Sequence, residues 1–296
     1  MLGELSALGS AVAWAFGTVL VKGPASRFSA LYLSAFRTVA SASLVLIVVL
    51  GTGQVGGIAH IPGWAIGLLL AGSLITVIGD VAFVRAIALD DMSRVFPVTT
   101  GLYILGSVGG SVIVAHEPVT WFTFGGGLLV IVSVSLIATA RRPRAADAQA
   151  RAAQGRARVR ALGLSVFAAI LWAVSLLILD RAMTEAEALP AAAIRIPFIA
   201  IVLSSLAWAR GDMGRYRRLE RRDLIALGAS GVLVGLSAIL FTNAIKMSSA
   251  GLVSILSSTS PLFVVPVSFL VLKEPMTRSL VLGTVLCMVG IWLTMQ

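Results

Sequence analysis

The sequence predicts an all-α integral membrane protein whose ten transmembrane helices form two inverted five-helix repeats. Three observations lead to this prediction: the composition, a series of long apolar runs, and an internal repeat. Of the 296 residues, 58% are hydrophobic and 12% are charged, and the mean hydropathy is +0.99. A soluble domain carries about a quarter charged residues. Backbone groups in lipid must be hydrogen-bonded internally, and long runs without alternation favour helices over a closed barrel.

The apolar runs are long enough to cross a bilayer, which takes about 20 residues. The first run lacks a basic segment before it and an Ala-x-Ala-like cleavage site after it, so we expect a retained span and not a signal peptide. Reading the runs in order gives ten spans, at 5–22, 30–50, 64–86, 93–115, 119–140, 161–181, 189–209, 223–245, 250–272 and 278–295.

The second half of the chain repeats the first at a nearly constant offset. A shift of 158 residues places Trp14 on Trp172 and Arg37 on Arg195. Each half has five spans, so the second half must enter the membrane from the opposite face. Such inverted repeats are typical of secondary transporters. The expected domains are a first repeat at 1–140, a basic linker at 141–160 and a second repeat at 161–296.

The linker reads "ARRPRAADAQARAAQGRARVR" from residue 140 to residue 160. Its charges and small side chains cannot bury apolar surface, so we expect a solvated connection. Nineteen of the 23 lysines and arginines fall on the face that holds this linker, and only Arg181 and Lys246 fall on the other. The positive-inside rule makes the basic face cytoplasmic and places both termini outside.

Two similar motifs, "VAHEPVT" (114–120) and "VLKEPMT" (271–277), close the fourth span of each half. His116 beside Glu117 suggests a metal or acid–base site. The second copy, however, has Lys273 in place of the histidine and keeps only Glu274 and its proline. Proline favours the first turn of a helix, and glutamate there faces the positive end of the helix dipole. We interpret both motifs as helix boundaries, with no catalytic residue and no metal ligand.

Several other functions are excluded by missing patterns. The single cysteine, Cys287, can form neither an internal disulfide nor a thiolate metal site. No Walker-type phosphate loop occurs, so ATP does not drive the protein directly. The formal charge of +10 lies mostly in the loops between spans, which argues against a nucleic-acid partner. We expect no cofactor.

Four longer stretches carry a resemblance to a known family. They are "AVAWAFGTVLVK" (11–22), "AAILWAVSLLILD" (168–180), "GDVAFVRAIALDDMSRVFPV" (79–98) and "FTNAIKMSSAGLVSILSSTSPLF" (241–263). With the two Glu-Pro motifs, they resemble the ten-helix EamA-type members of the drug/metabolite transporter superfamily. The resemblance implies a carrier of small metabolites, commonly an exporter. Eukaryotic members of the superfamily are generally described with cytosolic termini, which conflicts with the charge distribution here, and we follow the charges.

Charged residues inside spans are costly and mark functional candidates. Arg37 and Asp80 lie at matching depths, so we expect an ion pair, either structural or involved in coupling to protons. Arg195 repeats Arg37, but Ala238 stands at the position that corresponds to Asp80. Asp180 could pair with Arg195. An unpaired guanidinium would instead suit a carboxylate or phosphate, and snorkelling to the interface is the alternative.

Two polar stretches, "VTTGLY" (98–103) and "SILSSTSP" (254–261), are expected to line a cavity. Pro261 frees a backbone carbonyl near Ser257, and such groups are tolerated mainly beside a cavity or another helix. The aromatic candidates could equally serve helix packing. The expected substrate-binding residues are Trp14, Thr99, Thr100, Tyr103, Trp172, Arg195, Phe241, Ser257 and Ser258.

The sequence therefore predicts a multi-pass carrier in the plasma membrane of a bacterium or archaeon, monomeric or homodimeric. It would move a small amino-acid-like, amphipathic or anionic solute, as an exporter, by alternating access. An integral-membrane enzyme is the chief alternative, but no nucleophile–base pair or metal spacing supports it, and we expect no enzymatic activity. A channel would need a continuous polar stripe, which these spans lack.

Overall fold

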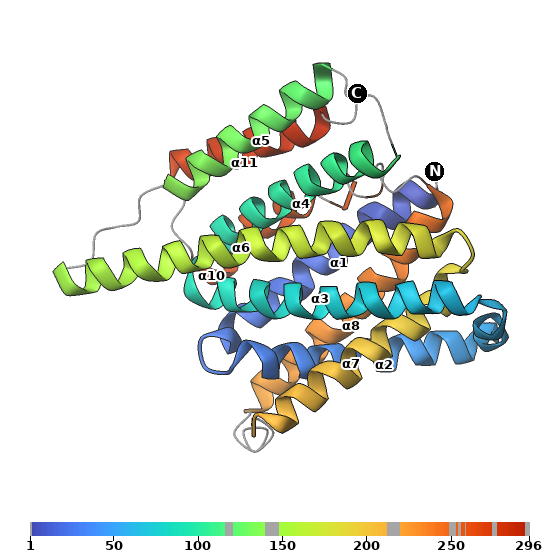
Figure 1. The fold of residues 1–296 in the computed structure, drawn as a ribbon. Coiled ribbons are helices and arrows are strands. Elements are labelled where there is room, and N and C mark those ends of the chain that lie inside the picture. The colour runs from blue at the N-terminus through green and yellow to red at the C-terminus, as the bar shows by residue number, and fades with distance from the viewer. Residues whose placement is uncertain are drawn as a thin grey trace.

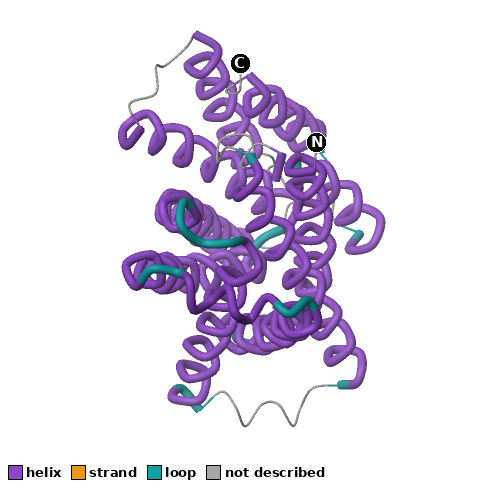
Figure 2. Tube along the Cα trace, turned by 90° about the vertical axis from the view of Figure 1, so that its right-hand side faces the viewer, coloured by secondary structure: helices purple, strands orange, loops and turns teal. Residues whose placement is uncertain are grey.

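The computed structural model describes residues 2–115, 121–139, 148–211, 220–248, 253, 256–257, 259–273 and 277–293. These residues form α-helices and one short 3-10 helix, and Figure 2 shows that helix makes up almost the whole trace. The all-α fold class is confirmed. In chain order the elements are α1 (Leu2–Ala25), α2 (Ala30–Gly51), η1 (Gln54–His60), α3 (Gly63–Leu89), α4 (Met92–Ala115), α5 (Trp121–Thr139), α6 (Ala148–Met183), α7 (Ala188–Ala209), α8 (Arg221–Met247), α10 (Ser260–Leu272) and α11 (Arg278–Leu293).

These helices correspond one to one with the ten predicted spans. By length and composition, six of them could each cross a membrane: α1, α2, α3, α7, α8 and the part of α6 from Ala153 to Met183. Shorter apolar helices occur within α5, α10 and α11. Large apolar side chains are exposed on the outer surface, among them Ile47, Ile201 and Trp208. An apolar surface of this kind marks contact with a membrane, so the chain is a multi-pass membrane protein.

Helix α6 is longer than predicted. It begins at Ala148, thirteen residues before the expected span, and its basic first part projects beyond the bundle (Figure 1). The segment 148–160 belongs to the stretch predicted to be a solvated linker, 141–160. Its residues from 153 to 156 are indeed exposed, but alanine, glutamine and arginine are strong helix formers, so the backbone continues the helix.

Helix α10 covers the second part of the predicted ninth span, 250–272. It starts at Ser260, with Pro261 in its first turn, and the described residues before it at 253 and 256–257 are also helical. Proline is favoured there because its missing N–H would have no partner within the helix. Pro261 has no N–H to donate to the carbonyl of Ser257, four residues earlier. The hydroxyl of Ser260 donates to this carbonyl instead, at 2.5 Å.

The ends of α2 and α7 show the repeat in atomic detail. Gly53 follows the C-cap of α2 and Gly211 follows the C-cap of α7, and both have φ of 70°. This left-handed conformation after a helix favours glycine, which has no Cβ. The two glycines are 158 residues apart in the chain, the offset found in the sequence.

The helices of one half pack on those of the other in the pattern that a two-fold axis requires. The first helix of each half contacts the third helix of the other, giving the pairs α1–α8 and α3–α6. The second, fourth and fifth helices pair with their own counterparts, as α2–α7, α4–α10 and α5–α11. Figure 1 shows α5 and α11 side by side.

Equivalent hydrogen bonds hold the two first–third helix pairs together. Ser230 of α8 donates to the carbonyl of Gly17 on α1 at 2.5 Å, and Ser175 of α6 donates to the carbonyl of Gly72 on α3 at 2.9 Å. Gly17 and Ser175 occupy one repeat position, and Gly72 and Ser230 occupy another. Serine and glycine are therefore exchanged between the two pairs. Small residues allow membrane helices to approach closely, and here they bring helices of the two halves together.

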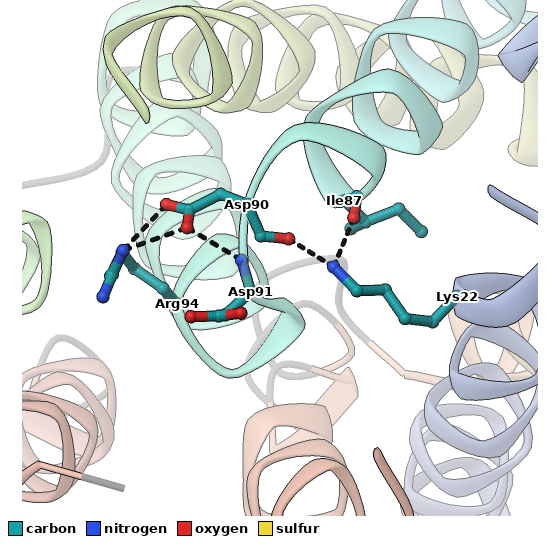
Figure 3. Close-up of polar contacts among 5 residues, drawn as sticks. All are labelled: Lys22, Ile87, Asp90, Asp91 and Arg94. Atoms are coloured by element: carbon teal, nitrogen blue, oxygen red, sulfur yellow. Dashed lines mark hydrogen bonds and ion pairs between the residues drawn. The ribbon is translucent and has the colours of Figure 1, made fainter. Parts of the chain in front are cut away.

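A polar network fixes the turn between α3 and α4 (Figure 3). Lys22 of α1 donates to the carbonyl of Ile87 at 2.5 Å and also to that of Asp90. Arg94 donates to both carboxylate oxygens of Asp90 at 3.0 Å. A cation at the end of a helix is favoured by the negative end of its dipole. The network thus joins three helices of the first half at one face of the bundle.

Candidate functional site

A cavity lies between the two halves of the bundle. Its volume is about 220 Å³, and helices of both halves form its wall. Three charged side chains line it, Arg37 on α2, Asp80 on α3 and Arg195 on α7. The rest of the described lining is hydroxyl-bearing, aromatic or aliphatic. Ligand cavities combine an apolar wall with a few convergent polar groups in this way.

Arg37 is the most unusual group in this wall. The residue is 4% exposed, yet neither Nε nor Nη1 of its side chain has a hydrogen-bond partner. Buried charged groups are normally paired, because removing a charge from water costs several kcal/mol. An unpaired guanidinium beside a cavity is therefore expected where an anion is to be bound.

Asp80 is hydrogen-bonded across the halves and does not contact Arg37. The indole Nε1 of Trp172 donates to its Oδ1 at 3.0 Å. The predicted Arg37–Asp80 contact is not formed in this structure, because the rotation of the helices directs the carboxylate toward α6. The charge of Arg37 still acts on Asp80 from a distance, as does that of Arg195.

For Arg195 the sequence left three interpretations open: a pair with Asp180, an unpaired guanidinium that holds an anion, and snorkelling to the interface. The carboxylate whose charge acts on it is that of Asp80. Asp180, the partner considered from the sequence, is exposed near the end of α6. One carboxylate thus lies within electrostatic range of the two guanidinium groups that the repeat places at equivalent positions.

Most of the predicted binding residues are brought together. Thr99 is the exception, since it points away from the cavity and its hydroxyl donates to the Val95 carbonyl at 2.8 Å. Ser258 lies outside the described residues, as do both Glu-Pro pairs and His116. The predicted residues that line the cavity are Trp14, Arg37, Asp80, Thr100, Tyr103, Trp172, Arg195, Phe241 and Ser257.

Sequence reasoning missed a set of hydroxyl groups in the wall. All but Thr38, which directly follows Arg37, lie about one helical turn from a predicted residue, so the helix period of 3.6 could have found most of them. Thr76 lies four residues before Asp80, and its hydroxyl is 2.7 Å from that of Ser175. The hydroxyls of Ser10 and Ser237 are 2.9 Å apart across the halves. The missed residues are Ser10, Thr38, Ser41, Thr76, Ser175 and Ser237.

An aromatic cluster bounds the cavity on one side. Trp14 and Trp172 line the cavity, and their ring centroids are 5.5 Å apart in an edge-on arrangement. Phe83 and Phe96 pack behind them, with Phe96 4.6 Å from Trp14 and Phe83 5.0 Å from Trp172. The cluster lies toward the face where α3 ends and α4 begins, the same face that carries the network of Lys22 and Asp90.

The comparison with protein families decides the class of the chain. The model of the EamA-like transporter family matches residues 1–139 and, again, residues 159–296. The chain belongs to the EamA-like transporter family. The two matched segments each contain five of the predicted spans. The family, the apolar helices and the cavity between the halves identify a membrane transporter.

Among the proteins similar to this EamA-like chain are a bacterial relative and a solved structure. One is the "Uncharacterized transporter YvbV" of Bacillus subtilis (strain 168), 29% identical over 148 residues. That match covers 50% of this chain and 48% of the relative, so the aligned region spans about half of each protein. A solved structure described as "Crystal structure of protein" matches with a TM-score of 0.67 at 13% identity. It covers 98% of this chain and 95% of that one, and at this identity the likeness concerns the fold alone.

Proposed function

We propose that this EamA-like protein is a secondary transporter that exports a small amphipathic solute bearing a carboxylate. The cargo would be amino-acid-like or another small organic anion. It would bind in the central cavity and cross by alternating access, with no enzymatic step. Arg37, Arg195 and the neighbouring hydroxyls would hold the polar end, while Trp14, Trp172 and Phe241 would contact the apolar part.

One observation carries the proposal: two guanidinium groups at a cavity between inverted halves, one of them with buried nitrogens that have no partner. Secondary transporters place their substrate site near mid-membrane, between repeats. A guanidinium presents a rigid fork that matches a carboxylate. An anion in the cavity would therefore supply the hydrogen-bond acceptors that Arg37 lacks.

The position of the cavity supports an alternating-access cycle. On α6 its lining includes Trp172 and Leu179, and on α8 it includes Val234 and Phe241. These residues lie between the middle of each helix and the face where both helices end. The aromatic cluster lies toward the opposite face. The arrangement fits a state that is closed toward one face and accessible from the other, and rocking of the halves would reverse it.

The charges of the loops give the proposed orientation. The basic face, with the network at the α3–α4 turn, would be cytoplasmic, and the cavity would then lie toward the outside. Export would require the aromatic cluster to open toward the cytoplasm. We propose the plasma membrane of a bacterium or archaeon as the location, with the lipid bilayer as the surrounding partner.

Counterflow in proteoliposomes tests the proposal. Vesicles loaded with an unlabelled organic acid are diluted into a trace of the same labelled acid. A carrier accumulates label transiently, because the internal acid exchanges for it. An enzyme would instead transform the acid, and a channel would show no stimulation from the opposite side. In vesicles whose protein binds the acid, transformation of the acid or a lack of stimulation from the opposite side would contradict the proposed function.

A further inference from the structure

The fixed charges of the cavity do not balance. Its described lining contains two guanidinium groups, Arg37 and Arg195, and one carboxyl group, Asp80. With this carboxyl ionised, the three charges sum to one positive charge, and with it protonated they sum to two. The hydroxyls in the wall can orient a ligand but carry no charge. An empty cavity therefore has excess positive charge in a region of low dielectric.

A positive group on the ligand would find no suitable place here. The single carboxylate already accepts the indole N–H of Trp172 and lies within the fields of both arginines. An ammonium group near Asp80 would be repelled by two guanidinium groups while attracted by one carboxylate. Like charges brought together in a binding site cost affinity and exclude the wrong ligand.

The charge of the bound state follows. A monoanion brings the sum to zero with an ionised Asp80, whereas a zwitterion leaves the excess unchanged. A dianion leaves one negative charge with an ionised Asp80 and reaches zero only if Asp80 also binds a proton. Because an uncompensated charge in a dry site is costly, the neutral combination is favoured.

We infer that the substrate is a monoanionic organic acid without an amino group, and that the cavity discriminates against amino acids. This inference rests on the proposed transport function and narrows its substrate class. The aromatic wall of Trp14, Trp172 and Phe241 fits an apolar or aromatic body next to the carboxylate. Planar rings stack on such side chains with ring centroids a few ångströms apart.

Binding to the purified full-length chain in nanodiscs tests the inference. The probes form two matched series. The aromatic series is 3-phenylpropanoate, phenylalanine, phenethylamine and phenyl phosphate. The aliphatic series is 4-methylpentanoate, leucine and 3-methylbutylamine. Within a series the body is nearly constant and the charge changes from −1 to zwitterionic to +1, with phenyl phosphate as the dianion. Calorimetric titration and the shift of Tm are read for each probe.

We expect the acid of at least one series to raise Tm and to bind at least about tenfold more tightly than its zwitterion. The amines should give no shift, and phenyl phosphate should bind more weakly than the acid. The inference is overturned if a zwitterion, an amine or the dianion binds as tightly as the acid, or if neither acid binds. If a zwitterion binds and also exchanges in counterflow, transport stands and only the substrate class fails. If a bound acid does not exchange, the transport function itself fails.

Discussion

The indole of Trp172 and the carboxylate of Asp80 form a hydrogen bond of 3.0 Å that joins the two halves at the cavity wall. Gly79 makes this contact possible. A Cβ at this glycine would lie 2.8 Å from both Cδ1 and Nε1 of Trp172, too close for any real contact. Because Gly79 has no side chain, the indole can lie beside the carboxylate of Asp80.

Gly79→Ala should consequently destabilise the protein and disturb the cavity. Overpacking of this kind costs about 1–3 kcal/mol, and the displaced indole should lose its bond to Asp80. Gly67→Ala on the same helix is the matched control. A Cβ there meets nothing within 4 Å, so this variant should be unchanged or slightly more stable. Thermal unfolding of both variants in detergent checks the prediction, and equal losses would mean that the contact with Trp172 is not the cause.

Arg37→Met should raise stability and reduce anion binding. The substitution removes a buried charge whose Nε and Nη1 have no partner, and we expect a gain of about 1–3 kcal/mol. Exchange of an organic acid should fall at least tenfold, since the guanidinium is proposed to hold the carboxylate.

Arg94→Met provides the comparison for this prediction. Arg94 is also buried but forms an ion pair with Asp90 at 3.0 Å. Removing one partner of a buried pair costs about 3 kcal/mol or more, so this variant should unfold at a lower temperature. If Arg37→Met is destabilised to the same extent, Arg37 has a structural partner and is not held in place for a ligand.

Asp80→Asn tests whether protons take part in transport. The amide keeps an oxygen that can accept from Trp172 but loses the group that could carry a proton. We expect exchange at equal pH on both sides to fall by less than about tenfold, because the guanidinium groups remain. Any acceleration of uptake by a pH gradient should disappear. A gradient response that survives unchanged in proteoliposomes would make Asp80 a structural partner of Trp172 only.

The spans could be predicted because the bilayer dictates their length and composition. The repeat could be predicted because equivalent positions keep their residues, as Trp14 with Trp172 and Arg37 with Arg195. Gly53 and Gly211 are separated by the same offset, and both have a left-handed φ. The repeat therefore preserves the backbone conformation at this position as well as the residue type.

The contacts across the cavity could be predicted only in part. Counting residues along a helix gives the depth of each residue. It placed Arg37 and Asp80 at one level, and both line the cavity. It gives no information on the rotation of neighbouring helices, which directs Asp80 to Trp172. Thr99 illustrates the same point, because its neighbour Thr100 faces the cavity while Thr99 bonds to its own helix.

The exposed basic start of α6 allows the orientation to be tested. A cysteine in place of Ala153, with Cys287 replaced by alanine, should not react with an impermeant maleimide in intact cells but should react in inverted vesicles. A cysteine in place of Glu185, exposed in the turn after α6, should show the opposite pattern. The expectation follows from the excess of basic residues on the face of Ala153. Ready labelling of the first variant from outside would reverse the orientation and, with it, the proposed direction of export.

Accessibility of the cavity from both faces tests the central claim most directly. Val234 lines the cavity on α8, and cysteine is close to valine in size. In the variant Val234→Cys with Cys287→Ala, the rate of labelling by an impermeant maleimide is measured separately in right-side-out and inverted vesicles, with and without a transported organic acid. We expect reaction from both faces, faster from the outside, and protection by the acid in each case, because one site opens alternately to each face. Labelling from a single face under every condition, in vesicles that still exchange the acid, would contradict alternating access through this cavity.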